Sequence, residues 1–90
     1  MKRLRAIVHG RVQGVGYRAA VHRRIAPIDV TGYVKNQPDG TVLIVAEGDQ
    51  STLEDVIDIA KSGSNWCSVS DIEISYESFE GNFPDFSIAY

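Results

Sequence analysis

The stretch HGRVQGVGYR, residues 9–18, connects a predicted strand to a predicted helix through a glycine-containing loop. Because a helix N-terminus carries partial positive charge, a cation in its first turn is disfavoured by roughly 0.3–1 kcal/mol. Loop amides and the first N–H groups of a helix also attract anions. Arg18 at this position therefore fits a binding site for an anion such as phosphate. A glycine turn followed by a solvated arginine accounts for the stretch equally well.

The segments on either side of this loop have clear hydrophobic periodicity. Residues 3–8 alternate, with an apolar face and a largely basic one, which predicts a half-buried strand. Residues 17–26 place Tyr17, Val21 and Ile25 on one side of a helix of about two and a half turns. The proline that follows ends this helix.

Two further strands and a second helix are predicted next. Residues 30–36 and 41–47 predict strands joined as a hairpin by the turn at 37–40, where Pro, Asp and Gly favour the backbone angles of a turn. Ser51 and Glu54 predict a capping box at the start of the second helix. Its apolar positions follow helical spacing and are Leu53, Val56, Ile57 and Ala60.

The last third of the chain predicts two more strands. The apolar positions change parity between Val69 and Ile72, which indicates a strand with a bulge near Ser70. After a polar connection at residues 79–84, residues 86–90 predict a short closing strand. The predicted fold is therefore α+β, a ferredoxin-like split β-α-β sandwich with an antiparallel sheet and two helices packed on one face.

This topology brings two polar side chains to the same side of the sheet. The first and third strands lie side by side at its centre, so the loop after the first strand and the end of the second open in one direction. Arg18 and Asn36 are therefore expected within reach of one ligand. The amide of Asn36 can hold a water molecule through its donor and its acceptor. Turn chemistry is, however, the commoner reason for an asparagine just before a hairpin turn.

Length, charge and cysteine content restrict the class of protein. The chain is expected to form a single domain over residues 1–90. The net charge is −3, but residues 1–28 carry +7 and residues 29–90 carry −10, so the loop lies in the basic part of the chain. The single cysteine, Cys67, fits a reducing compartment. We find no signal peptide and no apolar run that can span a bilayer, so we expect a cytoplasmic protein without a membrane partner.

Several functional classes are disfavoured by the motifs. Gly14-x-Gly16-x-x-Ala19 formally matches a dinucleotide-binding fingerprint, but the chain is too short for a doubly wound parallel sheet. The two histidines lie far apart and Cys67 has no nearby ligand partner, so no metal site is predicted. RNA-recognition domains share the predicted topology. No basic and aromatic run lies on a central strand, however, so no nucleic-acid partner is expected.

Taken together, these residues resemble the acylphosphatase family. Gly10-x-Val12-Gln13-Gly14-Val15-x-Tyr17-Arg18 is similar to the first signature of that family, with Tyr17 where phenylalanine is usual. Thr31-Gly32-Tyr33-Val34-Lys35-Asn36 resembles the second signature, with Tyr33 and Lys35 replacing the usual tryptophan and arginine. The resemblance covers nearly all of the chain.

The resemblance implies hydrolysis of acyl phosphates to a carboxylate and inorganic phosphate, without a metal or another cofactor. It implies that Arg18 and Asn36 are catalytic, with Asn36 orienting the attacking water. The phosphate-binding loop is then formed by the amides of Gln13, Gly14, Val15, Gly16, Tyr17 and Arg18. A small-molecule acyl phosphate and inorganic phosphate are the expected ligands, and the protein is expected to be a monomer.

Two alternatives stay open from the sequence. A catalytically inactive phosphate-binding or regulatory domain of the same fold would bind the anion without turning it over. An RNA-recognition domain would instead show salt-dependent retention of RNA.

Overall fold

The computed structural model describes residues 1–90 and contains five strands and two helices. The elements in chain order are β1 (Lys2–Arg11), α1 (Tyr17–Ile25), β2 (Thr31–Asn36), β3 (Val42–Gly48), α2 (Gln50–Ser62), β4 (Ser68–Glu77) and β5 (Phe86–Ala89). The predicted order of elements is confirmed. Neither helix has the length and apolar character needed to cross a lipid bilayer.

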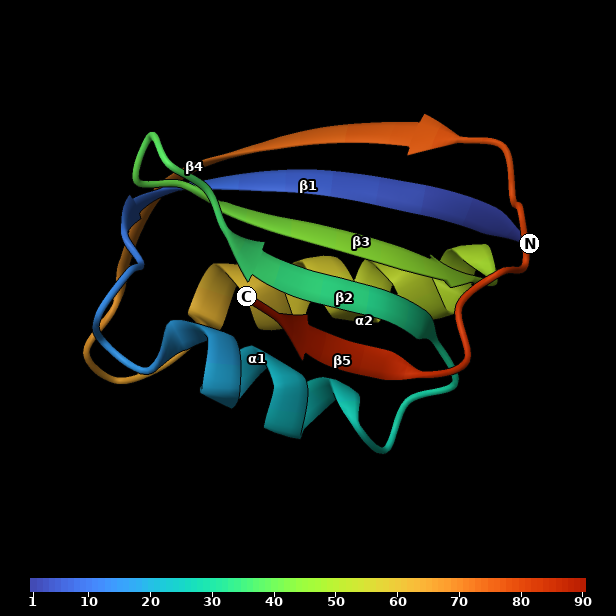
Figure 1. Cartoon of the computed structure of the whole chain (residues 1–90), viewed down its shortest axis with the longest axis horizontal. Helices are drawn as coiled ribbons and strands as arrows, with labels where there is room; N and C mark the ends of the chain where they lie inside the picture. The colour runs from blue at the N-terminus through green and yellow to red at the C-terminus, as the bar shows by residue number, and fades with distance from the viewer.

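The strands form one sheet in the order β4-β1-β3-β2-β5, with both helices on the same face (Figure 1). β1 and β3 lie at the centre and pair antiparallel, as the sequence predicts. The ferredoxin-like fold is confirmed, with one difference. β5 pairs parallel to β2, so that Gly32 lies opposite Phe86, and the sheet is mixed rather than wholly antiparallel. A parallel neighbour is possible here because α2 and β4 separate β5 from the β2–β3 hairpin in the chain.

The core lies between the sheet and the two helices. It combines the inward residues of β1 and β3 with the apolar faces of the helices, and its fully buried members include Leu4, Val8, Val21, Ile44 and Leu53. All seven residues of β3 are buried, so this central strand is covered on both faces. A strand buried on both faces reads as a continuous apolar run, which explains the composition of residues 42–46.

Two local predictions have different outcomes. The bulge near Ser70 is confirmed, since His9 pairs with Asp71 and Gly10 with Val69, leaving Ser70 as the extra residue. The capping box is wrong. Asp49 is the N-cap of α2 and makes no side-chain capping bond, and Ser51 lies inside the helix. The buried face of α2 also includes Ile59, which was not predicted, while Ile57 is partly buried against the core.

The sheet has two chemically different ends. β1 and β2 both finish at the end where the hairpin turn lies, so the loop before α1 and Asn36 are brought together there. The hairpin turn is held by backbone bonds from Gln37 N to Thr41 O (2.9 Å) and from Gly40 N to Gln37 O (3.1 Å). The opposite end holds the connection between β4 and β5, beside the first residues of β1 (Figure 1).

Candidate active site

The loop between β1 and α1 depends on two glycines for its conformation. Gly14 has φ 72° and Gly16 has φ 76°, in the left-handed region that disfavours residues with a Cβ. A Cβ added to either residue would meet no atom within 4 Å. Glycine is therefore required at these two positions by the backbone conformation and not by crowding from neighbouring groups. Gly16 is also the N-cap of α1, so the turn leads directly into the helix.

The backbone N–H groups of this segment are unpaired. None of the amides from Gln13 to Ala19 donates a hydrogen bond to another group of the protein. The last three of these amides are in the first turn of α1, where a helix offers no intrahelical acceptor. Consecutive free amides in a glycine loop followed by a helix N-terminus form a general binding site for anions.

Side chains from distant segments hold the loop in place. The Gln13 side chain donates from Nε2 to the carbonyl oxygens of Gln37 (2.8 Å) and Thr41 (2.9 Å), tying the loop to the hairpin turn. On the other side, Ser64 Oγ donates to the carbonyl oxygen of Val15 at 3.2 Å. The loop conformation is thus supported from two directions. Preorganised amides avoid the ordering cost that a flexible loop would have on ligand binding.

Tyr17 anchors the start of α1 in the core. Its ring is buried and its hydroxyl donates to the carbonyl oxygen of Ala60 at 2.7 Å. Burial, reinforced by Cys67, raises the pKa of the Tyr17 hydroxyl above its ordinary value. The hydroxyl is therefore a neutral structural donor, and the contribution of Tyr17 to the site is its backbone amide.

Arg18 projects from the first turn of α1 towards the end of β2. Its Nη1 donates to the carbonyl oxygen of Ala89 at 3.1 Å, and its guanidinium carbon lies 4.9 Å from the centre of the Tyr90 ring. The side chain is half-buried and forms no ion pair with an acidic residue. The carbonyl and the ring orient the guanidinium without neutralising it, so its charge remains available to an anion.

Asn36 is the last residue of β2 and faces Arg18 from the sheet. Its Oδ1 is buried and has no hydrogen-bond partner within the protein. Leaving a buried polar atom unpaired costs about 1–3 kcal/mol. A side chain kept in this state at a strand end is a candidate for a role in ligand or water binding.

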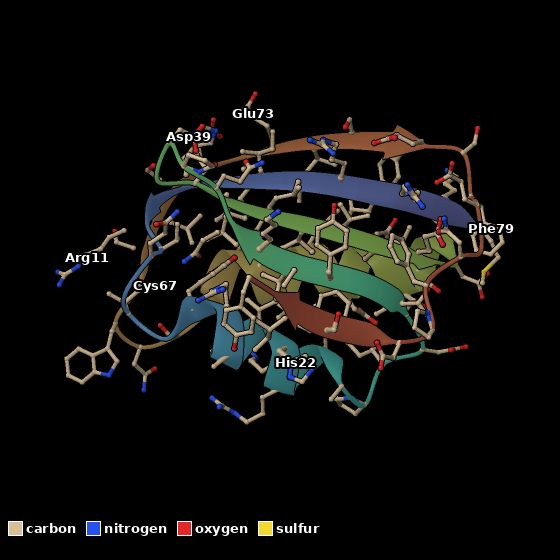
Figure 2. The ribbon with its side chains drawn as sticks, viewed as in Figure 1. Arg11, His22, Asp39, Cys67, Glu73 and Phe79 are labelled. Atoms are coloured by element: carbon tan, nitrogen blue, oxygen red, sulfur yellow. The ribbon has the colours of Figure 1, made fainter.

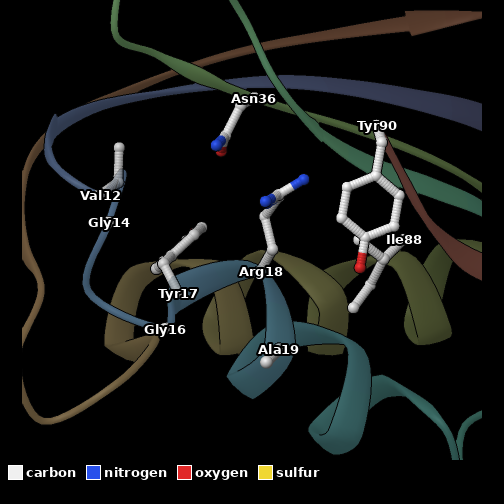
Figure 3. A pocket seen from close by; sticks show the side chains of 9 residues that line it. All are labelled: Val12, Gly14, Gly16, Tyr17, Arg18, Ala19, Asn36, Ile88 and Tyr90. Carbon is white, nitrogen blue, oxygen red and sulfur yellow. The ribbon is translucent and has the colours of Figure 1, made fainter.

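Arg18 and Asn36 line the same pocket, whose volume is about 160 Å³ (Figure 3). Both side chains point into the space between the end of β2 and the first turn of α1. The other lining residues are Val12, Gly14, Gly16, Tyr17, Ala19, Ile88 and Tyr90. Arg18 is the only charged residue among them, so the pocket is electropositive.

The sequence-based set and the observed pocket overlap without being identical. The structure brings together Gly14, Gly16 and Tyr17 with the two proposed catalytic residues, whereas the side chains of Gln13 and Val15 lie outside the pocket lining. Ile88 and Tyr90 are residues that the sequence analysis missed. Nothing in their local sequence signals a site, because they reach the pocket through the parallel pairing of β5 with β2.

Potential metal ligands do not gather in this structure. No group of three or more His, Cys, Asp or Glu side chains is arranged in a way that can hold a metal ion. Cys67 lies near the loop but contacts backbone carbonyls, with Sγ 3.1 Å from Ser64 O. The chemistry available at the pocket is therefore that of a guanidinium, a neutral amide side chain and backbone N–H groups.

The fold and this site define a class, an α+β ferredoxin-like domain with an anion-binding loop at one end of its sheet. The family model for acylphosphatases matches residues 4–88. An acylphosphatase of Caldanaerobacter subterraneus is 37% identical over 81 residues, covering 90% of each chain. An acylphosphatase of Thermococcus kodakarensis is 43% identical over 83 residues, covering 90% of this chain and 91% of the relative.

A solved structure supports the same relationship. The crystal structure of acylphosphatase from Bacillus subtilis superposes with a TM-score of 0.94 at 39% identity, covering 100% of both chains. This chain belongs to the acylphosphatase family. The family resemblance inferred from the two sequence signatures is thereby confirmed.

Proposed function

We propose that the protein hydrolyses the carboxyl-phosphate bond of acyl phosphates, releasing a carboxylate and inorganic phosphate. The observation that carries this proposal is the pocket in which a guanidinium, a series of free amides and an unpaired asparagine oxygen meet. Membership of the acylphosphatase family supports the same reaction.

Arg18 and the amides of residues 13–17 bind the phosphoryl group in this proposal. The guanidinium offers paired N–H donors that match two phosphoryl oxygens, and the loop amides receive the remaining negative charge. Phosphoryl transfer depends on positioning and charge stabilisation much more than on covalent participation by the protein. A preorganised loop next to a positively charged side chain meets this requirement.

Asn36 orients the attacking water. Its Oδ1 accepts a hydrogen bond from the water and its amide nitrogen can donate to a phosphoryl oxygen, which places the water oxygen towards phosphorus. The water oxygen forms a bond to phosphorus while the bond from phosphorus to the acyl oxygen breaks. We infer that a phosphoryl oxygen of the substrate accepts the water proton, because no basic side chain lines the pocket apart from the permanently charged Arg18.

The nature of the leaving group explains why the pocket needs no general acid. A carboxyl group has an ordinary pKa of about 4 and leaves as a stable carboxylate at neutral pH. No proton has to be delivered to it in the transition state, so a general acid is not required. The absence of an acidic side chain from the lining is consistent with this chemistry.

The experiment that tests the proposal is an assay of benzoyl phosphate hydrolysis, with and without a chelator, together with a titration of inorganic phosphate. Turnover that is insensitive to the chelator, with phosphate acting as a competitive inhibitor, is the expected result. Phosphate binding without turnover would contradict the proposal and indicate an inactive anion-binding domain. The predicted monomeric state is checked separately by sedimentation, and the predicted cytoplasmic location by cell fractionation.

A further inference from the structure

A second pocket lies directly beside the first. Its volume is about 540 Å³, and α1 forms one wall while the segment that follows α2 forms the other. The residues that matter for its chemistry are Gly16, Ala19, Arg23, Arg24, Asn65 and Trp66. Gly16 and Ala19 also line the first pocket, so the two spaces meet at the first turn of α1.

The second pocket is positively charged and has no internal counter-charge. It is lined by two arginines and by no acidic residue. Arg23 makes no ion pair or side-chain hydrogen bond, and Arg24 donates only to neutral groups, Ser62 Oγ (2.5 Å) and Gly63 O (3.3 Å). Two guanidinium groups that line one pocket without acidic residues make it positively charged, and an anionic group is favoured there.

The wall opposite α1 is held in place by the same contacts that support the loop. Ser64 Oγ bonds to Val15 O, and the Arg24 guanidinium bonds to Gly63 O, so the segment at residues 63–66 is attached to the loop and to α1. Trp66 on this wall is 78% exposed. An aromatic surface of this kind next to two guanidinium groups suits a ligand that has both an apolar part and an anionic part.

The position of this pocket next to the phosphoryl site suits the acyl half of the substrate. In the proposed reaction the acyl group stays bonded to phosphorus through the leaving oxygen until that bond breaks, so it has to lie next to the phosphoryl site. Figure 3 shows Asn36 above the space that the Arg18 guanidinium enters, and Gly16 and Ala19 below it at the first turn of α1. Gly16 and Ala19 line both pockets, so an acyl group attached to a phosphoryl group in the first pocket can extend past this turn into the second. The first pocket, at about 160 Å³, lies below the range of about 300–1,000 Å³ that is usual for larger ligands.

We propose that the second pocket binds the acyl half of the substrate and selects acyl groups that carry an additional anionic group, a carboxylate or a phosphate. This inference rests on the function proposed above. Arg23, whose charge is not engaged by any other group, makes the principal contact with the second anion. Arg24 adds positive charge and maintains the wall, and Trp66 covers the apolar part of the acyl group.

The test compares benzoyl phosphate with 4-carboxybenzoyl phosphate, two substrates that differ by a single carboxylate. The measured quantity is the selectivity, the ratio of the two kcat/KM values. We expect the wild-type protein to prefer the carboxylated substrate by roughly 10-fold or more, as for a hydrogen bond to a charged group. Arg23→Gln is expected to bring the selectivity close to one, mainly through KM.

The matched control is Arg11→Gln, which removes the same charge from an arginine outside both pockets. Figure 2 shows the Arg11 side chain extending away from the molecule at the loop end of the sheet. Arg11→Gln is expected to keep the wild-type selectivity. An equal loss of selectivity in Arg23→Gln and Arg11→Gln would overturn the inference, because it would indicate a general effect of positive charge and not a contact with Arg23.

The single tryptophan gives a second readout that does not depend on turnover. Terephthalate, the carboxylate product, is expected to change Trp66 fluorescence at lower concentration than benzoate, and Arg23→Gln is expected to remove this difference. If the wild-type protein hydrolyses benzoyl phosphate but does not prefer the carboxylated substrate, the inference is overturned and the proposed function is not. Failure to hydrolyse either substrate would overturn the proposed function and the inference together.

Discussion

Arg3 and Arg18 lie at opposite ends of the sheet, and each has its guanidinium carbon 4.9 Å from the centre of an aromatic ring, Phe83 and Tyr90 respectively. At the Arg3 end the guanidinium has two acidic partners. Arg3 Nε donates to Glu47 at 3.0 Å, and Arg3 Nη2 pairs with Glu80 at 2.7 Å. At the Arg18 end the guanidinium has one carbonyl partner and no acidic one.

The buried side-chain oxygens and the backbone amides also differ between the two ends: they are paired at the Arg3 end and unpaired at the Arg18 end. The Glu47 carboxylate is fully buried, and it accepts hydrogen bonds from the amides of Glu80 (2.9 Å) and Gly81 (3.2 Å) as well as from Arg3. Asn36 has a buried oxygen with no partner, beside amides that are also unpaired. A network with all groups paired stabilises the fold, whereas unpaired groups that face one pocket are available to a ligand.

The largest expected effect is that of Arg18→Ala. Removing the only charged group of the pocket is expected to lower kcat/KM for benzoyl phosphate by roughly 1,000-fold, as for other groups that stabilise phosphoryl charge. Binding of inorganic phosphate, measured by calorimetry, is expected to be lost. Arg18→Lys retains the charge but not the paired donors and should give an intermediate value. Unchanged phosphate affinity in Arg18→Ala would exclude Arg18 from the binding site.

Glu47→Ala tests the opposite end of the sheet. It leaves Arg3 and two amides without their buried acceptor, and losing one partner of a buried charged pair typically costs about 3–5 kcal/mol. The urea midpoint is expected to fall sharply, while kcat of the protein that remains folded is unchanged. Asp58→Ala, on the exposed face of α2, is the matched control and should alter stability by less than about 0.5 kcal/mol. A catalytic defect in folded Glu47→Ala would contradict the division between the two ends.

Asn36→Ala is expected to lower kcat by roughly 100-fold, comparable to the loss of one positioned polar group at an active site. Phosphate affinity should stay within about twofold. Because the substitution removes a buried oxygen that has no partner, the urea midpoint should not decrease. A variant with weakened phosphate binding and normal kcat would show that Asn36 is a ligand-binding residue rather than a water-orienting one.

The smallest effect concerns stability in acid. Burial of Glu47 opposes its ionisation, but the amides of Glu80 and Gly81 and the Arg3 guanidinium outweigh burial and hold the pKa of Glu47 below its ordinary value. The unfolded chain therefore binds this proton at higher pH than the native protein does. The contribution of Glu47 to stability is complete above the ordinary pKa of about 4.3 and is lost as the pH falls through the lower native pKa.

Urea titrations between neutral pH and about pH 3 measure this contribution. The wild-type protein is expected to lose more stability over this interval than Glu47→Gln, which has no carboxylate to protonate. Equal losses in the two proteins would show that Glu47 does not titrate in this range. The hairpin turn should contribute in the same direction, since hydrogen bonds from Thr41 lower the pKa of Asp39.

Local features of the chain were predictable because they depend on neighbouring residues. Gly14 and Gly16 mark a turn that needs left-handed backbone angles, and Arg18 follows at the helix start. The parity change around Ser70 located the bulge correctly. The capping box failed because Ser51 and Glu54 match a short pattern that the chain does not use: the N-cap is Asp49, two residues before Ser51, and α2 begins at Gln50.

The sequence by itself determined the order of elements, the glycine loop and the positions of Arg18 and Asn36 at adjacent element ends. Periodicity, turn chemistry and the two family signatures depend on residues close together in the sequence, so the sequence is sufficient to predict them. Only the tertiary structure placed Tyr90 against Arg18, left the Asn36 oxygen unpaired and brought Arg23 opposite Trp66. These contacts join residues far apart in the sequence, and packing of the helices and of the parallel strand β5 decides them, not local preference.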